Sequence, residues 1–214
     1  MVGELEREIE IKFDIPWNYN EVEFMFNVAN IIAATGWNLT GANVESSLQF
    51  QYYDTSQLDV YQAGDTIRRV SGFPESSNPE AIYRYDFKVG PIDDRYEVNL
   101  WSNELLSNED ISQGIREHCN YDQIMPSAFA NTRHLKLFFS LTGTYIEVTH
   151  DIFSVTEGSN FKELEIELKS GDPRELCKIA GLVRDETGLL SIDKQKYDRA
   201  IEGISGYAKK LSGF

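Results

Sequence analysis

The sequence predicts an α+β protein dominated by one antiparallel sheet that is curled or closed on itself. Two observations predict this class. Short strands follow one another with short turns between them, and longer helical segments are confined to four places along the chain. With 214 residues, of which 41% are hydrophobic, the chain can bury a sizeable core and is not generally disordered. We therefore expect residues 1–214 to form a single domain.

The helices are predicted mainly from their capping residues. The first is expected to begin at Asn20, because asparagine is a favoured N-cap, and to end before Gly36. Another is expected to begin at Pro173, since proline suits the first helical position and Asp172 can cap it. The four predicted helices span Asn20–Thr35, Asn108–His118, Pro173–Glu186 and Asp193–Gly203.

The strands are predicted from side chains that alternate with a period of two. The stretch GFPESSNP at residues 72–79 is expected to be a hairpin connection, because proline, glycine and serine favour turns. The predicted strands span Leu5–Phe13, Ser46–Asp54, Asp59–Tyr61, Asp65–Ser71, Ala81–Val89, Asp94–Trp101, Thr132–Ser140, Thr144–Phe153 and Asn160–Lys169.

Charged residues alternate with apolar ones in several of these strands. In Glu8–Lys12 the charges are separated by isoleucines, and Glu163–Glu167 has a glutamate at every second position. Such a pattern is typical of the solvated outer face of an antiparallel sheet. The alternative is a barrel whose apolar faces are covered by helices and whose charged faces line the interior. A row of glutamates favours this alternative, because neighbouring carboxylates repel one another unless cations lie among them.

A charged interior would combine two kinds of chemistry. Carboxylate oxygens suit hard divalent cations such as Mg²⁺ or Mn²⁺. Lysine and arginine bind phosphates, so the interior could hold a metal ion together with a phosphorylated ligand.

The composition limits the partners of the protein. Its 35 acidic and 20 basic side chains give a net charge of −15, which argues against nucleic acid and anionic membranes. The two cysteines, Cys119 and Cys177, are too far apart for a CxxC motif and fit a reducing compartment. The first residues, MVGELEREIEIKF, are unlike a signal peptide, and the apolar runs are too short to span a membrane. We therefore expect a cytoplasmic protein.

Four motifs follow one another along the chain. The first strand contains ExExK at Glu8–Lys12, and Tyr53–Arg68 contains YDT, AGD and a final arginine. A late acidic strand at Glu163–Gly171 reads ELEIELKSG, and Lys196–Ala200 reads KYDRA. In this order the motifs resemble the CYTH domain, which defines the superfamily of triphosphate tunnel metalloenzymes.

The resemblance implies a closed eight-stranded antiparallel β-barrel, a tunnel with helices packed outside. It also implies a metal-dependent triphosphatase, a phosphoric anhydride hydrolase that uses Mg²⁺ or Mn²⁺. The carboxylates expected to hold one or two metal ions are Glu8, Glu10, Asp151, Glu163, Glu165 and Glu167. The residues expected to bind the phosphates are Lys12, Arg68, Arg84, Lys88, Arg95, Arg133 and Lys196, with Lys12, Arg68, Lys88 and Arg95 as the catalytic candidates.

The sequence departs from the family pattern at two places. The family has Arg-x-Arg where this chain reads Arg68-Arg69-Val70. Either a bulge turns Arg69 inward, or one phosphate ligand is missing and Arg84 replaces it. Asp86 adds a negative charge on the face of the strand that carries Arg84.

Three functions are compatible with these residues. The leading hypothesis is hydrolysis of inorganic tripolyphosphate or thiamine triphosphate. The first alternative is a class IV-type adenylyl cyclase that makes cyclic AMP from ATP, and the second is a binder of polyphosphate or organic phosphates without catalysis. The expected partner is a small-molecule triphosphate, and the sequence leaves monomer and homodimer open.

Overall fold

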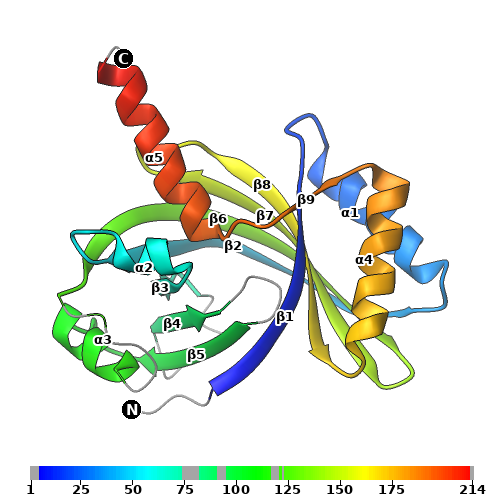
Figure 1. The fold of residues 1–214 in the computed structure, drawn as a ribbon. Coiled ribbons are helices and arrows are strands. Elements are labelled where there is room, and N and C mark those ends of the chain that lie inside the picture. Colours follow the sequence, from blue (N-terminus) through cyan, green and yellow to red (C-terminus); the bar gives the residue numbers. More distant parts are fainter. Residues whose placement is uncertain (1–4, 74–81, 91–94, 117–120, 122, 213–214) are drawn as a thin grey trace.

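The computed structural model describes residues 5–73, 82–90, 95–116, 121 and 123–212 (Figure 1). Its strands are β1 (Leu5–Asp14), β2 (Asn38–Asp54), β3 (Thr66–Ser71), β4 (Tyr83–Val89), β5 (Arg95–Ser102), β6 (Met125–Leu141), β7 (Thr144–Val155), β8 (Phe161–Ser170) and β9 (Leu190–Ile192). Its helices are α1 (Glu21–Ala33), α2 (Asp59–Ala63), α3 (Asn108–Ile115), α4 (Pro173–Thr187) and α5 (Lys196–Ser212). Most of the predicted connection at 72–79 lies outside the described residues, as do the predicted strand starts Ala81 and Asp94 and the helix end His118.

The strands form a closed barrel. Their order is β5-β4-β3-β2-β6-β7-β8-β1, and β1 pairs with β5 to complete the circle. Each of these pairings is antiparallel, and β9 adds to β1. The expected eight-stranded antiparallel barrel with helices outside is thereby confirmed.

One predicted strand, Asp59–Tyr61, is wrong, because these residues begin helix α2. The reason is Asp54, the last residue of β2. Its carboxylate accepts hydrogen bonds from the backbone amides of Val60 at 2.9 Å and Tyr61 at 3.0 Å. Amides at the start of a helix lack partners within the helix, so this carboxylate stabilises the helical turn.

The helices cover apolar outer faces of the barrel. Helices α1 and α4 pack over β1, β7 and β8, where buried residues such as Val28, Val183 and Ile166 form one core. A second core includes Phe87 of β4 and Ile111 of α3, and it continues to Ile201 of α5. Because the apolar side chains point outward into these cores, the alternating charged side chains point into the barrel. Within the described residues, no helix is long and apolar enough to cross a membrane.

Helix α5 begins against one end of the barrel (Figure 1). The hydroxyl of Tyr197 donates to Asp54 at 2.6 Å, and its ring stacks on Tyr52 with the centroids 5.1 Å apart. The side chain of Gln195 hydrogen bonds to the carbonyl of Gly64 and to the hydroxyl of Thr66. These contacts fix the first turn of α5 and explain why the YDT, AGD and KYDRA motifs occur together.

Candidate metal and phosphate site inside the barrel

The barrel encloses a cavity of about 240 Å³ whose walls are mostly charged. Carboxylates come chiefly from β1, β7 and β8, whose lining residues include Glu6 and Glu8, Glu147, and Glu165 and Glu167 respectively. Basic residues come from β1, β3, β4, β5, β6 and β8 and from the first turn of α5. The period of two in these strands therefore brings acids and bases that are distant in the sequence into one lumen.

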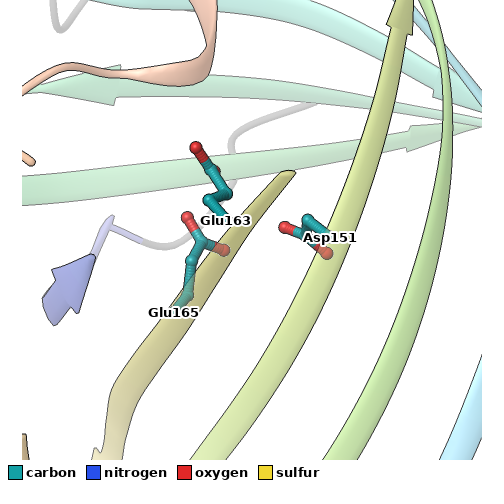
Figure 2. A group of neighbouring side chains, drawn as sticks. All are labelled: Asp151, Glu163 and Glu165. Carbon is teal, nitrogen blue, oxygen red and sulfur yellow. The ribbon is translucent and has the colours of Figure 1, made fainter. Parts of the chain in front are cut away.

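Three carboxylates form a compact group on the inward faces of β7 and β8, and one of them, Glu165, lines the cavity (Figure 2). Asp151 lies on β7, directly opposite Glu163 of β8, and Glu165 is the next residue of β8 on the same face. Each offers an oxygen atom, and the three atoms lie within 4.8 Å of one another. Asp151 and Glu163 are fully buried, so their charges must be balanced inside the protein.

Two lysines supply part of that balance. The ammonium of Lys196, from α5, lies 2.7 Å from Glu165 Oε2 and 3.4 Å from Glu163 Oε1, and it also contacts Asp151. Burial alone would lower the pKa of Lys196, but Asp151 and Glu163 outweigh burial and raise it. The ammonium of Lys12 contacts Glu165, and burial lowers its pKa to about 8.

The carboxylate group fits a hard divalent cation. It offers several oxygen ligands at short mutual distances, which is the donor set that Mg²⁺ and Mn²⁺ prefer. Glu163 Oε1 is buried and accepts no hydrogen bond from the described residues. Its nearest cation is Lys196 at 3.4 Å, while Arg199 pairs with the other oxygen of Glu163 at 3.1 Å, so Oε1 can still act as a ligand to a metal ion.

The other three predicted metal ligands lie elsewhere in the lumen. Glu8 binds Lys88 at 2.6 Å and Arg95 at 2.5 Å, and Glu10 contacts Arg95 as well. Burial alone would raise the pKa of Glu8, but Lys88 and Arg95 hold it well below its usual range. Glu167 pairs with Lys169 at 2.6 Å. The structure thus brings Asp151, Glu163 and Glu165 together, whereas Glu8 and Glu10 share Arg95 and Glu167 pairs with Lys169.

Two of the predicted phosphate ligands are bound to an acidic residue of the lumen. Asp86 accepts from Arg68 at 2.7 Å and from Arg84 at 2.6 Å and 3.0 Å. The register explains this contact, since Arg68 lies opposite Asp86, and Val70 lies opposite Arg84. Burial alone would raise the pKa of Asp86, but Arg84 and Arg68 lower it to about 2.

The bulge considered at Arg68–Val70 is absent from the described strands. The pairing runs without a register shift through Arg69, whose guanidinium lies 5.5 Å from the ring of Tyr83 on the outer face. Val70 is fully buried in the core that includes Phe50. One lumen position therefore carries an apolar residue, and Arg84 is the additional arginine in the lumen.

Arg133 requires a correction, because its side chain lies outside the barrel. It forms an ion pair with Glu21 of α1 at 3.1 Å and its side chain is 49% exposed. The alternation in β6 places the next residue, His134, in the lumen instead. His134 contacts Asp151 and lies 3.3 Å from the hydroxyl of Thr132.

Sequence reasoning also missed two lumen lysines. Lys136 lies 3.1 Å from Glu147, and Lys169 pairs with Glu167, and both lysines line the cavity. The alternation that was applied to the acidic residues could have found them, because Lys136 is two residues from His134 in β6.

Comparisons with known proteins show which solved structures share this fold. No family model matches the chain, and a search of the curated proteins found no match. Among solved structures, PH1819 from Pyrococcus horikoshii is similar, with a TM-score of 0.55 and 16% identity over 91% of this chain and 98% of that one. A nominal adenylate cyclase from Bacillus halodurans has a TM-score of 0.52 and 14% identity over 90% and 95%.

A third similar structure is HpAC1 from Hippeastrum, with a TM-score of 0.55 and 12% identity over 92% of this chain and 96% of that one. HpAC1 is described as a nominal adenylyl cyclase with a dominant triphosphatase activity. At these identities the likeness concerns the fold. The chain therefore has the tunnel fold of the CYTH and triphosphate tunnel proteins that its motifs resemble.

Proposed function

We propose that this protein is a divalent-metal-dependent hydrolase of a small-molecule triphosphate, with Mg²⁺ or Mn²⁺ as the cation. One observation carries the proposal: a group of three carboxylates that fits a metal ion reaches the cavity through Glu165, and several basic residues line the same cavity. The tunnel fold and the motifs of the sequence support the same function. The small lumen suits a compact ligand and excludes a folded macromolecule.

In this proposal Asp151, Glu163 and Glu165 hold the cation. When bound, a divalent cation neutralises charge on phosphate oxygens and lowers the pKa of a bound water, which favours attack on phosphorus. Glu8 and Glu10 act differently, because they hold the basic residues of β4 and β5 in place inside the lumen.

The basic residues bind and orient the phosphates. Arg95 offers a forked set of donors and Lys12 and Lys88 offer point charges, so together they replace the hydration of a highly charged ligand. All three are buried and lie in ion pairs with lumen carboxylates. A phosphate chain can therefore enter only by exchanging these internal partners for its own oxygens, which selects ligands with several negative charges.

Asp86 favours a second candidate function, a binder of phosphates that does not turn them over. Its carboxylate already neutralises Arg68 and Arg84, which leaves fewer cations to stabilise charge that develops during hydrolysis. Turnover and binding must therefore be measured side by side.

The test incubates the purified protein with tripolyphosphate, thiamine triphosphate or ATP in the presence of Mg²⁺ or Mn²⁺. We expect release of inorganic phosphate that stops when EDTA is added. Lys12→Gln is expected to lower the rate at least about 100-fold, whereas Arg133→Gln on the outer face serves as the matched control.

Three outcomes would contradict the hydrolase proposal. Tripolyphosphate binding in calorimetry without phosphate release would favour the binder. Cyclic AMP and pyrophosphate as the products from ATP would favour the cyclase. Release that is equal in wild type and Lys12→Gln would indicate a contaminating activity.

A further inference from the structure

The lumen has an aromatic corner that the proposed metal and phosphate chemistry does not use. Phe73 follows β3, and Trp101 lies in β5 on the face that carries Arg95 and Glu97. The two ring centroids are 5.4 Å apart, and the rings are inclined by 47°. Phe73 lines the cavity itself, and Trp101 is 36% exposed beside it.

Arg84 connects this corner to the charged part of the lumen. Its guanidinium carbon lies 5.6 Å from the ring centroid of Phe73 and 5.7 Å from that of Trp101. The guanidinium is also paired with Asp86 through two hydrogen bonds. Because its charge is already neutralised, Arg84 contributes a flat face next to two aromatic rings rather than a free cation.

The apolar wall continues from this corner along β2. Leu48 and Phe50 line the same cavity, and both are almost fully buried. Phe50 lies beneath the guanidinium of Arg68 at 4.5 Å. The lumen therefore has two unlike sides, one with carboxylates and lysines on β1, β7 and β8, and one with aromatic and apolar residues on β2 and at Phe73, just after β3.

An inorganic phosphate chain gains little from an aromatic and apolar wall, because all of its surface atoms are charged or strongly hydrated oxygens. A planar heteroaromatic ring does gain, since stacking on an aromatic side chain is worth roughly 5- to 150-fold in affinity. Phe73 lines the cavity and packs against Trp101, which is partly exposed, so this ring pair offers a surface on which such a ring can stack.

We propose that Phe73, Arg84 and Trp101 form a subsite for a planar aromatic ring joined to the triphosphate. The substrate class is then a ring-bearing organic triphosphate, such as a nucleoside triphosphate or thiamine triphosphate, and inorganic tripolyphosphate is the poorer substrate. This inference rests on the proposed function, because it assumes that the phosphates occupy the charged side of the lumen.

The experiment compares ATP, GTP, thiamine triphosphate and tripolyphosphate, both as substrates and by calorimetry in the presence of Mn²⁺. For the wild type we expect at least one ring-bearing triphosphate to bind about tenfold more tightly than tripolyphosphate. Trp101→Leu is expected to lower the affinity for that ring-bearing triphosphate about tenfold. Its affinity for tripolyphosphate is expected to stay within twofold of the wild-type value. Differences among the three ring-bearing compounds show which ring the subsite takes.

Tyr96→Leu is the matched control, because Tyr96 lies on the same strand but faces outward and is 49% exposed. It is expected to leave all affinities within twofold. The proposal is overturned if tripolyphosphate binds to the wild type as tightly as every ring-bearing compound. It is also overturned if Trp101→Leu lowers the affinity for all ligands equally. If the ring preference is found without turnover, the subsite stands and only the hydrolase proposal fails.

Discussion

Neutralising Lys196 is expected to tighten the binding of a divalent cation to the three-carboxylate group. The ammonium of Lys196 contacts Asp151, Glu163 and Glu165, so it occupies the region where the cation is proposed to lie. At about 4 Å and an effective dielectric constant of about 20, each pair of unit charges interacts by about 4 kcal/mol. A divalent ion is repelled by the ammonium to at least that extent unless Lys196 moves away.

Lys196→Gln removes this repulsion. We expect Mn²⁺ to bind at least about tenfold more tightly, which corresponds to about 1.4 kcal/mol and is well below the calculated repulsion because the lysine can shift. Without metal the variant is expected to be less stable by about 3 kcal/mol, since the removal of one partner leaves buried charges unpaired. Added Mn²⁺ is then expected to raise the Tm of the variant more than that of the wild type.

Calorimetric titration with Mn²⁺ and thermal unfolding with and without Mn²⁺ measure both effects. Lys194→Gln is the matched control, because Lys194 is two residues away, is 51% exposed and pairs with Glu202 outside the lumen. The reasoning is refuted if Lys196→Gln binds Mn²⁺ no more tightly than the wild type and Lys194→Gln do.

Three further predictions concern positions outside the metal group. Because the pKa of Asp86 is lowered to about 2, its contribution to stability is present above about pH 4 and is lost as the pH falls towards 2. The difference in unfolding free energy between wild type and Asp86→Asn should therefore shrink by about 2 kcal/mol between about pH 4 and about pH 2. A difference that stays constant over this range would contradict the prediction. Tyr197→Phe removes the donor to buried Asp54 and should cost about 1–3 kcal/mol in urea unfolding, so an unchanged midpoint would show that this bond does not anchor α5. Arg133→Ala should leave kcat/KM within twofold, and a large loss would place this side chain in the lumen after all.

Much of the barrel could be predicted because its evidence is local. The alternation in Glu8–Lys12 and Glu163–Glu167 defines the lumen face of two strands without any knowledge of their partners. The same rule brings Glu163 and Glu165 to one face. Helix α4 could equally be predicted from the sequence, since Asp172 accepts a hydrogen bond from the backbone amide of Arg174, as an N-cap residue does.

The parts that could not be predicted depend on contacts between distant residues. The turn at Asp59–Tyr61 is helical because the Asp54 carboxylate caps it, and a short segment carries no helical period of its own. Arg133 is expected in the lumen only from the family resemblance, whereas the alternation in β6 places its neighbour His134 there. The pairing of Asp86 with Arg68 follows from the β3–β4 register, which the sequence does not state.

The most direct test of the proposed metal site is a crystal structure of the protein grown with Mn²⁺, with data collected at the manganese absorption edge. We expect an anomalous peak inside the barrel, in contact with carboxylate oxygens of Asp151, Glu163 and Glu165. We also expect the ammonium of Lys196 to lie farther from these oxygens than in the metal-free protein. The absence of a peak in the lumen at millimolar Mn²⁺, or peaks only on surface carboxylates, would contradict the proposal that this barrel is a metal-dependent triphosphate site.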